Sequence, residues 1–510
     1  MISAFQAIRD PGRRPARRGT SARQEASAVD RAVRRALAGW GLLVAVSFAA
    51  GGVLHALGVL RIDHFPPFHA QFRVLTVSLL PAAVFGVAAV RILPRLTARV
   101  RFGWALAAGY ACALAWTVLL AVSGDGLAAP FTHPQEYPAV LPAVGDDPLA
   151  WLAGFTTNLP AYPTHVRGHP PLPVLVVWAL RAAGLGGPLW AAVVVVLVGC
   201  SATVAIALTV RRLSGDDDAR RVLPYLALAP ASVWIATSMD GFFAGVGAWG
   251  VALLVLGRGR AGRLVYGAAA GLLLGALPYL SYGLVPYLLI AVAVAAVVRP
   301  PKGALVAAVA GAAAVTLAFA AAGFLWPAGV LATHAQWAAD PGAARPYLYF
   351  LVADFGVLAL VTGPATAAGL VTLARLVRSV RLSGLGSLSG PALLSGLRAP
   401  SGPARLDGRV PARVAVPVAA ALAAVLALDL SGITRGEVER IWVPYALWIC
   451  LAAAFADRLP GRVSGRISGR APDGPGSGRG GLEPAAYGGP WLMAQMITGL
   501  LLQGLIASPW

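Results

Sequence analysis

A short polar stretch ahead of an apolar run carries the residue types best suited to chemistry. The stretch THVRGHPPLPVL contains Arg167 and His169 immediately before a Pro-Pro pair. Upstream, the stretch QEYPAV sets Glu136 beside Tyr137. A carboxylate can accept the proton of a hydroxyl, and arginine binds phosphate through paired, charge-assisted hydrogen bonds. The two stretches together therefore offer a group that can accept a proton and a group that can bind an anion.

Carboxylates gather in the segment that contains both stretches, residues 124–169. The whole chain has only 21 Asp and Glu residues against 41 Lys and Arg, yet this segment holds more acids than bases. Its acids are Asp125, Glu136, Asp146 and Asp147. Asp146 and Asp147 precede a proline, so they also fit a helix N-cap. No His or Glu spacing supports a metal at the Asp pair, so no metal or other cofactor is predicted.

The composition indicates a membrane protein. Hydrophobic residues make up 58% of the 510 positions and charged residues only 12%, whereas about a quarter of a soluble domain is charged. Apolar runs of about 17–25 residues recur from residue 36 onward, long enough to cross a hydrocarbon core of roughly 30 Å. We therefore predict an all-α, polytopic helical membrane protein with about 13 transmembrane helices.

The expected spans follow the apolar runs. They are residues 36–60, 74–93, 103–122, 189–210, 222–238, 240–257, 264–280, 284–298, 304–324, 348–370, 414–430, 441–456 and 491–507. Residues 170–183 are also apolar, but a run of 10 to 14 residues is more often re-entrant or interfacial than spanning. We expect a partial insertion there. The Pro-Pro pair can simply start this helix, and Arg167 can contact anionic lipid headgroups, so neither feature alone requires a chemical role.

The net charge of +20 fits this topology. The basic residues, all but one of them arginine, fall mostly in short segments between apolar runs. By the positive-inside rule these segments are cytoplasmic. This places the N-terminus inside and the C-terminus outside a bacterial plasma membrane. Because the topology accounts for the positive charge, nucleic acid is not expected as a partner. Cys112, Cys200 and Cys450 lie within apolar runs, which argues against disulfides and against a Cys-based metal site.

The topology divides the chain into eight segments. The first four segments are an Arg-rich cytoplasmic tail, the leading transmembrane helices, an extracytoplasmic acidic loop and the transmembrane core. The acidic loop carries short amphipathic helices and the partial insertion. The last four segments are a cytoplasmic flexible loop, further transmembrane helices, a second cytoplasmic flexible loop and a last transmembrane helix. The two loops are expected to be flexible because they are rich in Gly, Ser, Pro and Arg, which cannot bury enough apolar surface to become ordered. In order, the segments are residues 1–35, 36–123, 124–187, 188–370, 371–413, 414–456, 457–489 and 490–510.

Further candidate residues lie near the outward ends of later spans. Asp240 stands at such an end, and an ionisable residue at membrane depth is a functional-site hypothesis because an unpaired charge there costs a few kcal/mol. Arg345 and Tyr347 lie in an outward segment and are further candidates for contact with a substrate. Arg440 either forms a local ion pair with Glu439 or belongs to the same pocket.

The motifs together resemble the GT-C superfamily, membrane glycosyltransferases that use polyprenyl-phosphate sugars and include protein O-mannosyltransferases and lipid-linked sugar transferases. The resemblance rests on an acid–Tyr pair in an outward loop and a basic residue ahead of Pro-Pro-Leu, in QEYPAV and VRGHPPL. The later stretches TSMDGFFAGVGAWG, RGEVERIWVPYALW and WLMAQMITGLLLQGLI are also similar, so the resemblance covers most of the chain from Gly103 onward. Two features depart from the pattern: the loop follows the third span instead of the first, and Gln135-Glu136 replaces the usual Asp-Glu pair.

The resemblance implies a function and a set of roles. The chain is expected to move a sugar from a polyprenyl-phosphate donor to a glycan, lipid or protein of the cell envelope, within the lipids of the plasma membrane. Glu136 or Asp125 would be catalytic. The donor phosphate would be bound by Arg167, His169 and Arg345, and the substrate pocket would include Tyr137, Asp146, Asp147, Asp240, Tyr347 and Arg440. The alternative is a multi-pass transporter or lipid flippase, which should instead show inverted repeats, broken helices and ionisable residues at mid-membrane.

Overall fold

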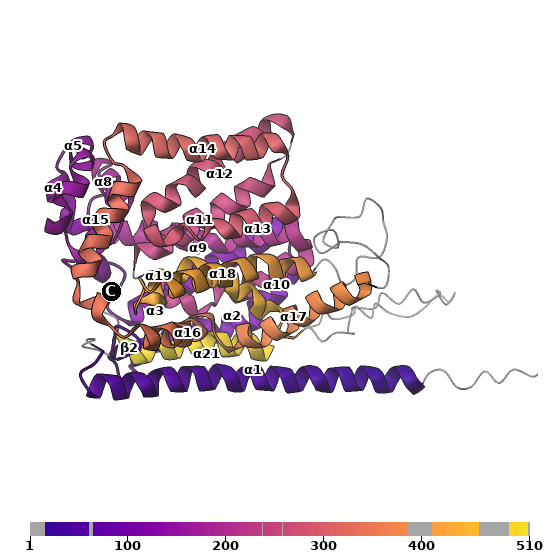
Figure 1. The fold of residues 1–510 in the computed structure, drawn as a ribbon. Coiled ribbons are helices and arrows are strands. Elements are labelled where there is room, and N and C mark those ends of the chain that lie inside the picture. Colours follow the sequence, from indigo (N-terminus) through magenta and orange to yellow (C-terminus); the bar gives the residue numbers. More distant parts are fainter. Residues whose placement is uncertain are drawn as a thin grey trace, which may run out of the picture.

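The computed structural model describes residues 16–60, 65–236, 238–257, 259–385, 411–457 and 489–507 (Figure 1). Within these residues nearly all regular structure is helical, which confirms the prediction of an all-α protein. The exception is a pair of antiparallel two-residue strands, β1 (Gln71–Phe72) and β2 (Ile506–Ala507). These strands were not predicted, and they join an early connection to the end of the last helix, α21 (Gly489–Leu505).

Eight helices in the described part of the chain are long and apolar enough to cross a membrane, or nine spans if one bent pair is counted. They are α1 (Ala16–Ala56), α2 (Leu80–Arg99), α3 (Phe102–Ser123), α9 (Pro188–Ser214), α11 (Met239–Leu256), α12 (Arg260–Leu280), α14 (Lys302–Ala321) and α18 (Ala415–Ser431). The bent pair, α16 (Tyr347–Thr362) and α17 (Pro364–Leu385), turns by 96° where Gly363 and Pro364 interrupt the helix. The bundle is that of a membrane-embedded protein.

Some predicted spans contain shorter helices than their apolar runs suggested. The runs at 222–238, 284–298 and 441–456 contain all or part of α10 (Asp216–Ala227), η5 (Pro230–Trp234), η6 (Tyr282–Leu284), α13 (Leu288–Val298), α20 (Val443–Ile449) and η10 (Cys450–Phe455). Hydropathy reports apolar length but does not detect breaks in a helix, such as those that proline introduces by removing an N–H donor. The total of thirteen spans stays a prediction.

The helices lie roughly side by side, so the bundle has two ends (Figure 1). We call one the loop end, because residues 124–187 lie there together with α15 (Trp326–Ala339). We call the other the arginine-rich end, where the turns from α2 to α3, from α9 to α10, from α11 to α12 and from α13 to α14 lie. Arg220 of α10 joins two of these turns by donating hydrogen bonds to the carbonyls of Thr97 and Val100.

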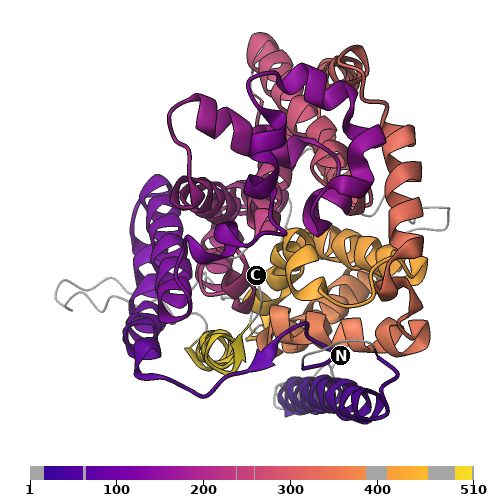
Figure 2. The ribbon, with the colours of Figure 1, turned by 90° about the vertical axis from the view of Figure 1, so that its left-hand side faces the viewer.

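Residues 124–187 form a succession of short helices at the loop end (Figure 2). The helices are η2 (Ala129–Thr132), η3 (Tyr137–Val140), α4 (Leu141–Val144), α5 (Pro148–Ala153), α6 (Phe155–Asn158), η4 (Leu159–Ala161), α7 (Thr164–Arg167) and α8 (Leu172–Ala182). Fully buried Phe155 packs against Tyr162 and against Phe324, which follows α14, with ring centroids 5.5 and 5.7 Å apart. This aromatic contact fixes the segment to the bundle. With 11 residues, α8 is too short to span, although its depth in the membrane stays a prediction.

Two of the predicted segment boundaries differ from the helices. The predicted tail ends at residue 35, but α1 already begins at Ala16 and continues without a break. The predicted flexible loop starts at residue 371, yet α17 extends to Leu385. Residues 1–15, 386–410 and 458–488, which contain the start of the tail and most of both flexible loops, lie outside the described residues.

Helices α12 and α14 approach each other closely along a row of small residues. A Cβ added at Gly271 would lie 1.9 Å from the carbonyl oxygen of Ala308, closer than real atoms come. Gly267 and Gly275, four residues to either side, would meet α14 at 2.4 and 2.6 Å. Small residues allow this approach, which provides van der Waals contact where lipid offers no hydrophobic driving force.

We therefore predict that Gly271→Val separates the two helices and destabilises the protein. Overpacking at a closely packed position typically costs about 1–3 kcal/mol, so the thermal midpoint measured in detergent should fall by several degrees. Gly39→Val on α1 is the control, since a Cβ there meets nothing within 4 Å. Equal midpoints for the two variants would contradict the close approach of α12 and α14.

Candidate functional site

Gln135 holds the short helix α7 against the turn that carries Glu136. Its side-chain oxygen accepts a hydrogen bond from the N–H of Thr164 at 2.8 Å, and its carbonyl accepts one from the N–H of His165 at 3.3 Å. Pro163 precedes the helix with an extended backbone, φ −57° and ψ 159°. These contacts direct the His165 side chain toward Glu136, so the two polar stretches singled out in the sequence come together.

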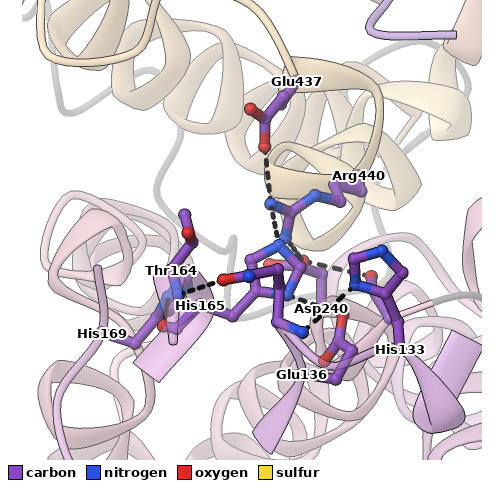
Figure 3. A network of polar contacts seen from close by, with 10 residues as sticks. His133, Glu136, Thr164, His165, His169, Asp240, Glu437 and Arg440 are labelled. Carbon is purple, nitrogen blue, oxygen red and sulfur yellow. Dashed lines mark hydrogen bonds and ion pairs between the residues drawn. The ribbon is translucent and has the colours of Figure 1, made fainter. Parts of the chain in front are cut away.

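His165 and Glu136 form a buried pair (Figure 3). His165 Nδ1 lies 2.7 Å from Glu136 Oε1, and the two side chains are only 3% and 1% exposed. On the other side of the ring, His165 Nε2 lies 3.0 Å from Nη2 of Arg440. Since arginine can only donate, Nε2 must accept, and the ring proton is on Nδ1, facing Glu136. Although burial raises it, the pKa of Glu136 is lowered by the hydrogen bond with His165 and the charge of Arg440.

Arg440, on α19 (Val438–Ile441), is the centre of the network in Figure 3. Its side chain is 5% exposed and lies 2.7 Å from Glu437 Oε2 and 3.4 Å from Asp240 Oδ2. Ser238 Oγ donates to the same oxygen of Asp240 at 3.1 Å. Burial lowers the pKa of Arg440, but the neighbouring carboxylates more than offset this, raise its pKa above the usual value and keep it charged. The same attraction lowers the pKa of Glu437 to about 2, against the effect of burial.

Glu437 holds an unusual backbone conformation. With φ at 62°, it is one of two non-glycine residues with positive φ in the described part of the chain. Such a residue costs about 1–3 kcal/mol and persists where surrounding contacts fix it, often at a functional site. Here the contact with Arg440 fixes it, and the strain points to this loop as more than a connection.

The network borders a cavity of about 370 Å³ at the loop end. Its walls come from α7, α15, the segment after α15 and the loop between α18 and α19. Polar and aromatic side chains that line it include His165, Arg167, His169, His334, Trp337, Asp340, Glu437 and Arg440. Arg167 is 31% exposed, and within the described residues its one ion pair is a long contact, 4.0 Å, with Asp340. Glu136 and Asp240 do not line the cavity, so His165 and Arg440 separate them from it.

Arg345 and Arg435 also line this cavity, where they form a clamp between two loops. Arg345 Nη1 donates to the carbonyl of Arg435 at 2.8 Å, and Arg435 Nη1 donates back to the carbonyl of Arg345 at 2.9 Å. The Arg435 guanidinium also lies over the rings of Trp337 and Tyr347, 5.5 and 5.7 Å from their centroids. Arg345, expected to bind phosphate, is thus committed in part to joining two loops. Tyr347 donates to the carbonyl of Leu430 at 3.1 Å and does not line the cavity.

His169 lines the cavity as a neutral ring. Its Nδ1 lies 2.8 Å from the carbonyl of His165, which can only accept, so this nitrogen carries the proton. Burial first, and then the charge of Arg440, lowers the pKa of His169 to about 3. His169 therefore brings no positive charge to a phosphate. Tyr137 is buried and packs edge-on against it, with ring centroids 5.8 Å apart.

Asp125 lies in a different cavity of about 240 Å³, between the end of α3 and the strand pair. Arg73, His133 and Gln503 also line this second cavity, and Arg73 donates to the carbonyl of Gln503 at 2.7 Å. His133 belongs to the turn that ends at Glu136, because its carbonyl accepts the N–H of Glu136 at 3.0 Å. The two acids that the sequence left in competition therefore face different spaces.

Asp146 and Asp147 lie apart from both cavities. Asp147 accepts the N–H of Ala150 at 2.9 Å and caps α5, as the simpler interpretation of this pair predicted. Asp146 is fully exposed and lies 3.4 Å from Arg181. No cluster of His, Cys, Asp and Glu in the described residues has a geometry that holds a metal.

A second group of acids lies behind the cavity wall. Asp354, Asp429 and Glu439 come from α16, α18 and α19, and each is at most 1% exposed. Asp354 lies within electrostatic reach of the other two. Burial, with a smaller contribution from Glu437, raises the pKa of Glu439 to about 8. The ion pairs of Arg440 described above are with Asp240 and Glu437.

The sequence interpretation missed His165, Glu437 and Asp340 as parts of the site. His165 stands in the same stretch as Arg167, but no periodicity showed which histidine would face Glu136. Glu437 lies in the stretch RGEVERIWVPYALW, where Arg440 alone was chosen. The preceding residue, Gly436, was a weak signal in the sequence, because glycine favours turns; in the structure its φ is 95°.

Glu439 provides a pH test of this buried region. Its folded-state pKa of about 8 exceeds the unfolded value, so the stability that the neutral carboxyl provides is complete below about pH 4.5 and is lost as pH rises through 8. Glu439→Gln removes this loss. The thermal midpoint of the variant minus that of the wild type should increase by a few degrees from pH 5 to pH 8.5. A difference that stays constant with pH would show that Glu439 is already charged.

Comparisons of the chain with protein-family models, with curated proteins and with solved structures gave no match. The function must therefore be inferred from the residues and from the geometry of the loop end.

Proposed function

We propose that this protein is an integral membrane glycosyltransferase of the GT-C type, which moves a sugar from a polyprenyl-phosphate donor to an acceptor of the cell envelope. The observation that carries the proposal is the 370 Å³ cavity, where guanidinium and carboxylate groups meet at one end of a bundle of apolar helices. Such a cavity suits a ligand with an anionic headgroup and an apolar tail. The tail can stay in the bilayer while the headgroup enters the cavity.

Arg167 and Arg440 are the proposed phosphate ligands. Sugar transfer breaks the bond between the anomeric carbon and a phosphate oxygen, which leaves with the bonding electrons. Fixed positive charge stabilises that oxygen as negative charge develops. Arg167 is partly exposed in the cavity wall with only a long contact to Asp340, so it can turn to a phosphate. His169, being neutral, shapes the site and accepts hydrogen bonds at most.

We assign the proton of the acceptor hydroxyl to His165, supported by Glu136. In the structure Arg440 donates to His165 Nε2. A phosphate that draws Arg440 away frees this nitrogen, which lines the cavity and can accept the proton as the hydroxyl oxygen bonds to the anomeric carbon. Glu136 then stabilises the imidazolium through Nδ1, as in carboxylate–histidine pairs of known enzymes. On this proposal Glu136 is a positioning residue, whereas the sequence alone suggested it as the base.

The arrangement of the two ends supports the proposed orientation. Arginine-rich turns gather at one end, which the positive-inside rule assigns to the cytoplasm. The loop end, with the cavity, then faces outward from the plasma membrane, where acceptor glycans, lipids or proteins of the envelope are found. Helix α1 begins at the arginine-rich end, and β2 lies at the loop end, in agreement with an inside N-terminus and an outside C-terminus (Figure 1).

The test is donor turnover by the purified protein in lipid nanodiscs. Polyprenyl-phosphate mannose and a polyprenyl-phosphate pentose serve as donors, with an extract of envelope glycans as acceptor, and the release of polyprenyl phosphate is measured. Glu136→Gln keeps the size of the side chain, but the neutral amide cannot stabilise the positive charge that His165 gains when it accepts the proton. Turnover should fall roughly 10²-fold, the usual scale for losing general-base catalysis, and His165→Gln should lose as much.

Asp125→Asn is the matched control for this experiment. Its carboxylate lies in the second cavity, so the variant should keep most of the activity. Activity lost with Asp125→Asn but retained with Glu136→Gln would move the base to Asp125 and keep the enzyme. Full activity in both single variants and in the double variant would refute the carboxylate mechanism. Donor carried across the membrane without release of phosphate would support a flippase instead.

A further inference from the structure

A small hollow at the arginine-rich end is surrounded by three arginines. Arg212 comes from the last turn of α9, Arg263 from the first turn of α12, and Arg299 from the end of α13. The hollow has a volume of about 70 Å³ and also has Gly257 and Pro301 in its wall. No acidic residue lines it, so three positive charges from separate connections meet without a carboxylate in the wall.

The three guanidinium groups keep their charge available. In the described part of the chain, none of them forms an ion pair with a carboxylate. Arg212 donates from Nε to the carbonyl of Val255 at 2.9 Å, which fixes the side chain while its two terminal nitrogens remain for another acceptor. By contrast, neighbouring Arg211 pairs with Asp216. Three like charges around one space repel each other, and an anion between them would relieve that repulsion.

Arg299 has a strained backbone conformation that places it in the wall of the hollow. Its φ of 57° and ψ of 66° are left-handed, a conformation in which glycine would be easier to place. The only other non-glycine residue with positive φ in the described chain is Glu437, at the loop-end site. Strain of this kind persists where a residue has a specific position to occupy. Here the left-handed turn places Arg299 in the wall of the hollow.

Exposed apolar side chains near the hollow favour a lipid over a soluble ion as its ligand. Beside Arg263, the α12 side chains of Leu264 and Val265 are 46% and 66% exposed, and Val306 of α14 is 68% exposed. These exposed apolar side chains lie within one helical turn of Arg263 and Ala304, which line the hollow, and they offer a surface for acyl chains. The hollow has room for about two water molecules of ~30 Å³ each, comparable to one tetrahedral oxyanion and too small for a whole headgroup.

We propose that this hollow binds the phosphate of an anionic phospholipid, whose acyl chains lie along α12 and α14. Arginine suits the role because its planar fork pairs with phosphate oxygens, and basic pockets at helix ends are a known means of binding lipid headgroups. The site is far from the loop-end cavity along the helices, and it does not depend on the proposed transfer of a sugar.

The experiment measures lipid retained by the full-length protein in native mass spectrometry. The protein is exchanged into detergent containing equal amounts of phosphatidylglycerol and phosphatidylcholine. The wild type should retain phosphatidylglycerol in preference, and the triple variant R212Q/R263Q/R299Q should retain at least about tenfold less. The triple variant R95Q/R99Q/R101Q is the matched control, because it removes the same charge from exposed arginines at the same end and should behave as the wild type.

Three outcomes would overturn the proposal. Equal losses in both triple variants would show a diffuse attraction of lipid to a basic surface. Inorganic phosphate at millimolar concentration that displaces phosphatidylglycerol from the protein would assign the hollow to a free anion. If the first triple variant does not fold, Arg263→Gln alone replaces it, because this side chain is exposed and makes no ion pair in the described chain. Retention equal to that of the wild type in this single variant would then count against the site.

Discussion

Arg440 carries a full positive charge at a position that water barely reaches, and the loop-end site depends on how that charge is balanced. Leaving a buried guanidinium alone would be costly. The chain balances it with carboxylates from two directions: Glu437 on the adjacent turn and Asp240 at the start of α11. The third contact is neutral, since His165 accepts from Arg440 with one nitrogen and faces Glu136 with the other. Removing any one partner alters the electrostatics of the others.

This network also explains why several distant segments must meet. Glu136, His165, Asp240 and Arg440 come from the loop before η3, from α7, from α11 and from α19. Asp240 and Arg440 each have one partner at the start of their own helix, Ser238 and Glu437, but the remaining contacts of the network join different segments. The aromatic contacts of Phe155 and the clamp of Arg345 with Arg435 hold the loops in place around them. The cavity is thus the product of the packing of the loop end as a whole.

How much of this followed from the sequence depends on the range of the interactions. Apolar length and arginine distribution are local properties, so the helical class of the protein and the gathering of arginines between spans could be predicted. Glu136, Asp240 and Arg440 could be chosen singly, because polar residues at the ends of apolar runs are conspicuous. Their partners could not. Which histidine turns toward Glu136 is decided by the two hydrogen bonds of Gln135, and the separation of Asp125 into another cavity is decided by the strand pair. Both are long-range contacts that no spacing in the chain reveals.

The central claim is that a lipid phosphate binds where Arg167 and Arg440 face the loop-end cavity. An electron cryomicroscopy structure of the full-length protein in nanodiscs with undecaprenyl phosphate tests it directly. We expect phosphate density within hydrogen-bonding distance of Arg167 or Arg440, with Arg440 displaced from His165 Nε2 and the prenyl chain leaving toward the bilayer. Lipid phosphate found only elsewhere, with Arg440 still bonded to His165, would contradict the account.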